Sequence, residues 1–199
     1  YSRNSAGKIL IDANGFPVVD PDQGIVGDPN PDWLAGLNNT LRYKQFGLSF
    51  FFDMKKGGDL ENGSDSYNFF YGVAKATENR APIIVDGVNA SDGKPNTKAV
   101  SAQAYWQSRQ YESIIQDGTY IKLRNVSISY ELKPALLAHT PFKSASLSVT
   151  GRNLWIYSPH FTGADPEVSS YGSNNASQGI YAFSTPTSRS FNFSLKCSF

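Results

Sequence analysis

Apolar and polar residues alternate along several stretches of the chain, most regularly at its C-terminal end. Five apolar side chains there are separated by single polar residues: Phe191, Phe193, Leu195, Cys197 and Phe199. A β-strand would place all five on one face. Similar alternation predicts antiparallel strands at about 36–44, 46–56, 119–132 and 144–157, with the C-terminal strand at 188–199. The pattern therefore predicts an all-β chain with five long strands.

The predicted strand at 119–132 changes the phase of its apolar positions. Val126 and Ile128 share one parity, whereas Ile121 and Leu123 take the other. A slip of one residue near Arg124 would return both pairs to the same face. We therefore expect a β-bulge there, because bulges insert one extra residue into a strand and bend it.

The connections between the predicted strands alternate between short and long. The links at 44–45 and 133–143 are short, whereas 54–119 and 158–188 are long. Two stretches with helical spacing, 64–80 and 101–115, lie in the first long connection. Outer-membrane barrels have short turns on one side and long loops on the other. The alternation favours a transmembrane β-barrel over a soluble β-sandwich, which stays as the alternative.

Composition supports this choice and narrows the function. Aromatic residues make up 14% of the 199 residues and charged residues 18%, while the mean hydropathy is −0.37. Apolar runs are far shorter than the roughly 20 residues of a membrane helix. A formal net charge of +1 argues against nucleic-acid binding. One cysteine and two histidines leave little for a disulfide framework, a metal site or a catalytic relay, so we expect no enzyme activity.

Several motifs in order resemble one family. They are Gly27–Trp33 (GDPNPDW), Gly36–Thr40 (GLNNT), Tyr43–Lys44, Gly57–Asp59 (GGD), Tyr120–Tyr130 (YIKLRNVSISY), Pro134–Leu137 (PALL), Gly151–Leu154 (GRNL), Asp165–Glu167 (DPE) and Arg189–Leu195 (RSFNFSL). The chain resembles the C-terminal part of SusC/RagA-type TonB-dependent outer-membrane transporters. The match spans nearly all of residues 1–199. The first residue is not Met and no signal peptide follows, which predicts a processed chain or a fragment.

The resemblance implies the last five or so strands of a 22-stranded barrel, with an N-terminal plug outside this chain. Five strands cannot close a barrel, and open edges are not tolerated in lipid, so the rest of the transporter is an expected partner. The family further implies a SusD-like surface lipoprotein as a lid, TonB acting through the plug, and contact with membrane lipid or lipopolysaccharide. The expected function is import of glycans (oligosaccharides) or peptides across the Gram-negative outer membrane. The alternative is a soluble β-sandwich carbohydrate-binding module.

The resemblance and the strand pattern assign expected roles to individual residues. The C-terminal signal for barrel assembly would comprise Phe191, Phe193, Leu195 and Phe199. Aromatic residues near strand ends, where membrane-interface girdles form, are Tyr43, Phe46, Tyr130, Trp155 and Tyr157. The expected lumen-facing residues are Lys122, Arg124 and Arg152, either as wall ion pairs or as contacts to substrate or plug.

The long connections carry the remaining candidates. Aromatic residues that would contact ligand or lid, or simply pack within the loops, are Trp106, Phe161, Tyr171 and Tyr181. The carboxylates Asp59, Asp165 and Glu167 lack a spacing that predicts paired acid and base catalysis. We expect no cofactor, and calcium at these carboxylates is a weaker hypothesis.

Overall fold

The computed structural model describes residues 1–172 and 178–199, and the chain divides into two compact units. Unit 1 comprises residues 1–29, 59–116 and 169–184, and unit 2 comprises residues 30–58, 117–168 and 185–199. Each unit is thus assembled from three separate stretches of the chain, and we describe each by itself.

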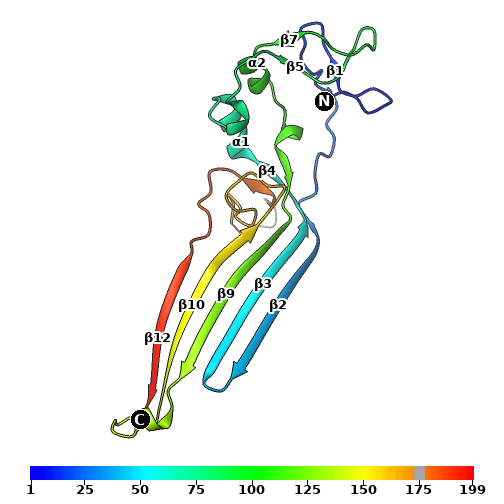
Figure 1. Cartoon of the computed structure of the whole chain (residues 1–199). Coiled ribbons are helices and arrows are strands. Elements are labelled where there is room, and N and C mark those ends of the chain that lie inside the picture. The colour runs from blue at the N-terminus through cyan, green and yellow to red at the C-terminus, as the bar shows by residue number, and fades with distance from the viewer. Residues whose placement is uncertain (173–177) are drawn as a thin grey trace. The chain divides into compact units, whose positions relative to one another are not determined.

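Unit 2 is built on one antiparallel sheet of five long strands, in the spatial order β12-β10-β9-β3-β2 (Figure 1). Their bounds are β2 Pro31–Tyr43, β3 Phe46–Gly57, β9 Tyr120–Glu131, β10 Ser144–Tyr157 and β12 Ser190–Ser198. A short helix, α3 Pro134–Leu137, lies between β9 and β10. β2 begins earlier than the sequence predicts because Trp33 and Leu34 still pair with Lys56 and Lys55 of β3.

The register of the sheet separates apolar from polar side chains. One row across all five strands consists of Leu41, Leu48, Ile128, Val149 and Phe193. The next rows on the same face hold more large apolar side chains: Tyr43, Phe46, Tyr130, Leu147 and Leu195 in one, and Phe50, Val126 and Phe191 in the other. On the opposite face the rows are mainly Ser, Thr and Asn: Ser49, Ser127, Thr150 and Asn192, with Thr40 at the edge. Alternation along every strand therefore gives the sheet an apolar face and a polar face.

A register shift interrupts the sheet where the sequence predicts a bulge. On β3, Phe51 pairs with Asn125 and Phe52 with Leu123, so Arg124 is the extra residue of β9. The pairing of β9 with β10 shifts at the same level, between Arg152 and Trp155. The predicted slip near Arg124 is confirmed, and it returns Leu123 to the apolar face.

The apolar face of this sheet is exposed. Phe193 exposes 79% of its surface, and the neighbouring large apolar residues Phe46, Ile128, Leu195 and Phe199 are also exposed. Within the described part of unit 2, no second sheet packs on the five strands. β2 and β12 are the two edge strands, so each has one side without a strand partner among the described residues. A β-sandwich would instead bury this face between two sheets.

Unit 1 consists of short elements joined by turns. Its strands are β1 Leu10–Ile11, β4 Asp59–Asn62, β5 Ile83–Ile84, β6 Val88–Asn89, β7 Ala99–Val100 and β11 Ile180–Tyr181, and β8 Ile115–Asp117 extends one residue into unit 2. Its helices are α1 Gly63–Phe70 and α2 Ala102–Gln107, with 3₁₀ turns η1 Lys75–Thr77 and η2 Tyr111–Ile114. β1 pairs with β6, β5 with β7, and β4 lies between β11 and β8.

Two small packing centres hold unit 1 together. Ile11, Val85 and Val100 form a buried apolar cluster. The second centre is aromatic: Phe69 of α1 stacks on Trp106 of α2 at 5.1 Å between ring centroids. The helices predicted in this connection are present but shorter, because η1 and η2 replace their C-terminal parts. No helix among the described residues is long and apolar enough to cross a membrane.

Candidate functional site

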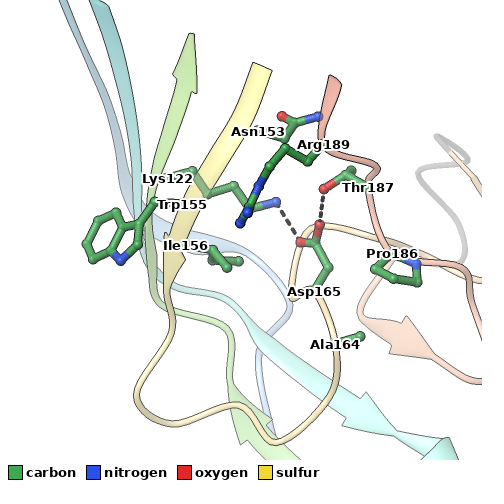
Figure 2. Close-up of a pocket in the computed structure, with 9 residues that line it drawn as sticks. All are labelled: Lys122, Asn153, Trp155, Ile156, Ala164, Asp165, Pro186, Thr187 and Arg189. Atoms are coloured by element: carbon green, nitrogen blue, oxygen red, sulfur yellow. Dashed lines mark hydrogen bonds and ion pairs between the residues drawn. The ribbon is translucent and has the colours of Figure 1, made fainter. Parts of the chain in front are cut away.

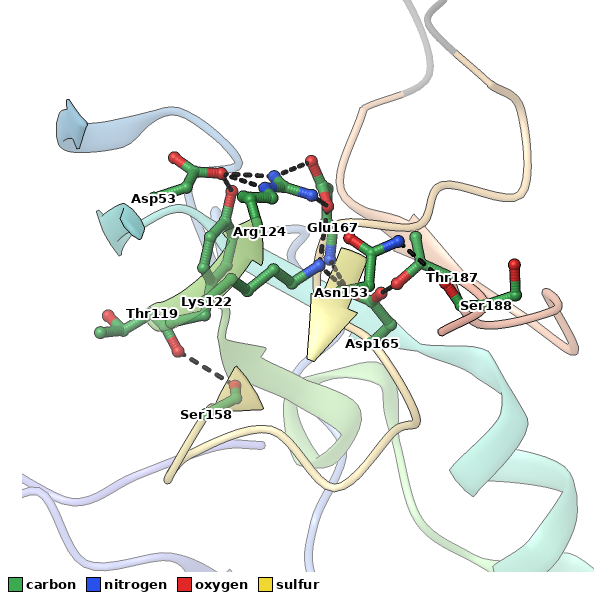
Figure 3. Close-up of polar contacts among 11 residues, drawn as sticks. Asp53, Thr119, Lys122, Arg124, Asn153, Ser158, Asp165, Glu167, Thr187 and Ser188 are labelled. Atoms are coloured by element: carbon green, nitrogen blue, oxygen red, sulfur yellow. Dashed lines mark hydrogen bonds and ion pairs between the residues drawn. The ribbon is translucent and has the colours of Figure 1, made fainter. Parts of the chain in front are cut away.

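A cluster of charged side chains lies on unit 2, beside the bulge in β9. Figure 3 shows Lys122 and Arg124 of β9 surrounded by Asp53 of β3 and by Asp165 and Glu167 of the connection that follows β10. Because Arg124 is the extra residue of the bulge and Lys122 pairs with Asp53 in the sheet, one end of the sheet presents two cations to this connection.

Lys122 is the buried centre of the cluster. Its side chain is only 5% exposed, and its Nζ lies 2.6 Å from Asp165 Oδ1 and 2.7 Å from Glu167 Oε2. A buried ammonium group is costly unless it is paired and hydrogen-bonded, and both conditions are met here. Asp165, itself almost fully buried, also accepts a hydrogen bond of 2.6 Å from Thr187 Oγ1.

Arg124 joins the connection to the neighbouring strand. Its Nε donates to Asp53 Oδ2 at 2.9 Å, its Nη1 donates to Glu167 Oε2 at 2.6 Å, and its Nη2 contacts both carboxylates. The Tyr120 hydroxyl donates to Asp53 Oδ2 at 3.2 Å. The guanidinium group therefore bridges β3 and the connection through one planar set of donors, as arginine does in bidentate pairs.

The electrostatics of the connection follow from these contacts. Burial alone would raise the pKa of Asp165, but hydrogen bonds from Lys122 and Thr187 outweigh it, and the pKa lies below its ordinary value. Burial likewise opposes ionisation of Glu167, and the hydrogen bonds from Arg124 and Lys122 lower its pKa overall. Both carboxylates are thus held as anions, which is the opposite of what a general acid for glycoside hydrolysis requires.

A pocket of about 240 Å³ adjoins this cluster (Figure 2). Lys122, Asp165 and Thr187 line one part of it, with Asn153 and Arg189 beside them. Asn153 Nδ2 donates to the carbonyl oxygen of Ser188 at 2.9 Å, which ties the bulge in β10 to the segment before β12. The ion pairs of the cluster hold the connection near 165–167, and the hydrogen bond of Asn153 to Ser188 holds it near 187–188. Both ends of the connection are therefore attached to the strands.

The expected lumen-facing and interface residues lie in the following places. Lys122 pairs with Asp53 and Arg152 with Asn125, both on the polar face, and Arg124 lies in the bulge between them. Tyr43, Phe46 and Tyr130 form one apolar row at the end of the β2–β3 turn. The Phe46 and Tyr130 rings lie 4.9 Å apart, and Trp155 stacks on Tyr157 near the opposite end of the sheet.

The two aromatic rows are separated by the length of a membrane strand. Tyr157 pairs with Ile121, which pairs with Met54, and Met54 is the ninth residue counted from Phe46 on β3. A transmembrane β-strand needs about 9–11 residues. The span from Phe46 to Met54, with both rows included, thus reaches the lower end of this range.

The aromatic and acidic candidates in the connections differ in exposure. Phe161 and Tyr181 are buried, whereas Trp106 is partly buried, packs against Phe69 and Tyr105, and lines a pocket of unit 1. Tyr171 is exposed. The carboxylate of Asp59 accepts a hydrogen bond of 3.0 Å from the Asp28 amide within unit 1. No group of three or more metal-binding side chains is arranged around a common point among the described residues.

Sequence reasoning named Lys122, Arg124, Asp165 and Glu167 but did not pair them. Glu167 lies 43 residues after Arg124, and no periodicity links a strand with a loop over that distance. Asp53 was missed, although an acidic residue at the end of an apolar run was a usable signal.

Comparisons with known proteins agree with the barrel interpretation. No family model matches the chain. It is 32% identical over 193 residues to TonB-dependent receptor P3 of Formosa agariphila, which covers 95% of this chain and 18% of the receptor. It is 25% identical over 171 residues to TonB-dependent receptor SusC of Bacteroides thetaiotaomicron, covering 81% of this chain and 15% of SusC. The chain thus spans less than a fifth of these curated relatives.

Solved structures show the same fold. A chain of the RagAB peptide transporter superposes with a TM-score of 0.62 at 19% identity, over 97% of this chain and 20% of that one. The RagAB peptide importer in the "closed-closed" state gives a TM-score of 0.62 over 96% of this chain. The sheet with its exposed apolar face is therefore a segment of a membrane β-barrel wall. More particularly, it is similar in sequence and fold to SusC/RagA-type TonB-dependent receptors, as the motifs predicted.

Proposed function

We propose that the chain forms part of the wall and outer connections of a TonB-dependent importer in the Gram-negative outer membrane. The observation that carries the proposal is the exposed apolar face, which is continuous over five strands. Soluble monomers rarely expose apolar patches larger than a few hundred Å². A lipid layer is the environment in which this face is favourable.

The two faces and two edges of the sheet define the proposed contacts. The apolar face meets lipid or lipopolysaccharide, with aromatic residues such as Tyr43 and Trp155 at the two interfaces. The polar face, with Lys122 and Arg152, lines the lumen. The outer edges of β2 and β12 pair with further strands of the same transporter, because unpaired backbone groups are not tolerated in lipid. The apolar side chains of β12, together with Phe199 directly after it, serve as the signal for barrel assembly.

The proposed reaction is transport without chemistry on the substrate. An oligosaccharide or peptide would be captured outside with the help of a SusD-like lipoprotein, and TonB would act through a plug that is not part of this chain. The lowered pKa values of Asp165 and Glu167 support a structural role for these carboxylates and speak against acid catalysis.

Neighbouring positions on β10 give a direct test. Leu147 lies on the apolar face and Ser148 on the polar face. We would place a single cysteine at each position (Leu147→Cys or Ser148→Cys, with Cys197→Ser) in the complete receptor, label it with bimane, and reconstitute it in vesicles with doxyl-labelled lipid. Lipid should quench the probe at 147 and leave the matched control at 148 unquenched. Equal behaviour of the two probes, or a protein that stays in solution without detergent, would overturn the proposal in favour of a soluble binding module.

A further inference from the structure

The pairing of β12 with β10 stops before β10 ends. The last paired residues are Ser190 and Arg152, whereas β10 continues beyond them and stays paired with β9 on its other side. The pocket of about 240 Å³ lies along the part of β10 that β12 leaves uncovered, because Trp155 and Ile156 line it. This volume is below the roughly 300–1,000 Å³ of typical small-molecule sites, so the pocket suits one chemical group of a larger ligand.

Among the described residues, Arg189 is the charged side chain of this pocket that lacks a counter-charge. It is exposed, extends from the segment before β12 toward β10 (Figure 2), and makes no ion pair or hydrogen bond with the described part of the chain. Lys122 and Asp165 neutralise each other at 2.6 Å, and both oxygens of Asp165 already accept hydrogen bonds. The remaining carboxylates of the charged cluster do not line the pocket. The lining therefore carries one unpaired positive charge, which favours an anionic group.

The alternation of β12, continued by two residues, places Arg189 on the apolar side of the sheet. Phe191 and Phe193 lie on the apolar face, and position 189 has the same parity. Trp155 shares that face, since it pairs with Leu123, and it is about half exposed. A tryptophan beside a long cationic side chain at the end of an apolar face is typical of a membrane interface.

Another cation at the same end of the apolar face is already paired. Lys56 of β3 has the parity of Met54, which lies on the apolar face, and its Nζ is 3.7 Å from Asp117 Oδ2. Arg189 has no such carboxylate among the described residues. Its charge is thus available to an anion that the described part of the chain does not supply.

We infer that Arg189 binds a phosphate group of an outer-leaflet lipid, whose headgroup lies beside Trp155 and whose acyl chains cover the neighbouring apolar face. A guanidinium group offers a planar fork of donors that matches two oxygens of a phosphate. An anion free in solution would gain from the fork but not from the adjacent apolar surface, so a lipid is favoured.

This inference rests on the proposed function, which places the long connections, and with them this end of the sheet, on the outer side of the membrane. It deepens that proposal because it assigns a lipid phosphate to one named side chain. The sequence-based candidates included Trp155 as an interface residue and did not include Arg189.

The test uses the complete receptor, freed of lipid in detergent, with diphosphoryl lipid A as the probe and native mass spectrometry as the readout. We expect the tightest site to bind lipid A, and to bind the same lipid without its phosphates at least about tenfold more weakly. Arg189→Ala should weaken the binding of lipid A by a similar factor. Arg189→Lys keeps the charge but lacks the fork, and should lie between the two. Arg152→Ala is the matched control, since Arg152 is an exposed arginine on the polar face, paired with Ser190.

A purely structural role of Arg189 has a different signature. An arginine that pairs with another strand of the receptor would stabilise the protein with and without lipid, whereas a lipid ligand stabilises only the receptor that binds it. Arg189→Ala should therefore unfold at the wild-type temperature in detergent alone, and below the wild-type temperature when lipid A is added. A variant that is destabilised equally in both conditions would contradict the inference.

Three binding results would also overturn it: no binding of lipid A, equal binding after its phosphates are removed, or unchanged binding in Arg189→Ala. Inorganic phosphate that displaces lipid A at equal concentration would show a general anion site and remove the lipid assignment. The failure of the proposed function is distinguishable, because the bimane probe at 147 would then escape quenching by lipid. Quenching at 147 together with lipid A binding that is independent of Arg189 would leave the proposed function standing and remove this site.

Discussion

Lys122 is a buried cation whose charge is balanced by two carboxylates on another segment. Removing one partner of a buried pair leaves the other charges uncompensated, which costs far more than the pair contributes when intact. The main role of Lys122 is therefore to hold the 165–167 segment in place, and its net contribution to the free energy of unfolding is smaller. The cluster as a whole carries three carboxylates and two cations.

Lys122→Met should release that segment from the strands. The buried Asp165 loses its ammonium partner, so we expect a loss of about 3–5 kcal/mol in the stability of the local structure. Limited proteolysis of the complete receptor, read as the rate of cleavage within 158–168, measures this effect. Lys196→Met is the control, because Lys196 is exposed and has no ion pair among the described residues. Equal cleavage rates for the two variants would contradict the role given to Lys122.

Acid should release the same segment. The folded pKa values of Asp165 and Glu167 are lowered, so their contribution to stability is fully present above their unfolded values, near 4. It is lost as the pH falls through the folded values. Cleavage by pepsin near Phe161 should therefore accelerate below about pH 4. The Lys122→Met receptor serves as the reference, since it lacks the part of the pH response that depends on the pairs of Lys122 with Asp165 and Glu167. A wild-type rate that simply tracks this reference would refute the prediction.

At the scale of single elements, the effect of a substitution in the C-terminal strand depends on which face of the sheet the residue occupies. Phe191 pairs with Gly151 in the row that crosses Val126 and Phe50, midway between the two aromatic rows. A lysine at the centre of the lipid-facing side costs about 2–4 kcal/mol. Phe191→Lys should thus reduce the amount of folded receptor in the outer membrane. Asn192→Lys, one residue further and on the opposite face, should have little effect. Similar losses in both variants would contradict the assignment of faces.

The bulge on β10 requires one residue, Asn153, to adopt an unusual backbone conformation. Asn153 has a φ of 52°, a left-handed conformation that asparagine and glycine tolerate and β-branched residues do not. Asn153→Val should cost roughly 1–2 kcal/mol more than Asn153→Gly, while both lose the hydrogen bond to Ser188. Urea unfolding of the complete receptor in detergent compares the two. A valine variant as stable as the glycine variant would show that the bulge relaxes without strain.

At the scale of the whole chain, the sheet was predictable and unit 1 was not. Alternation of period two located the five strands, and the parity change at Arg124 located the bulge, because each is a local consequence of side-chain direction. In unit 1 only α1 and α2 left a periodic signal, and the two-residue strands and 3₁₀ turns that make up most of its other elements left none. Its three stretches come together through contacts such as the 2.7 Å hydrogen bond from the Glu61 amide to Gly179. Such contacts depend on tertiary packing, which no local pattern records.

The candidate sites likewise contain some residues that the sequence predicts and others that it does not. Lys122 and Arg124 follow from polar positions in a strand, but their partners in the connection do not. One pocket of unit 1 is lined by residues as far apart as Tyr67 and Tyr171, and of these two only Tyr171 was a candidate in the sequence. Exposed aromatic residues in loops are common enough that their convergence becomes visible only in three dimensions.

The hydroxyl-rich rows of the polar face have a consequence for selectivity. Ser49, Ser127, Thr150 and Asn192 carry no charge and have short side chains. As a lining of the proposed lumen, these four side chains would offer passing solutes neutral, exchangeable hydrogen bonds, whereas Lys122 and Arg152 would place charge nearer one end of the same face. Discrimination between charged and uncharged cargo would then fall to the charged end of this face and to the outer connections, and not to the hydroxyl-rich rows.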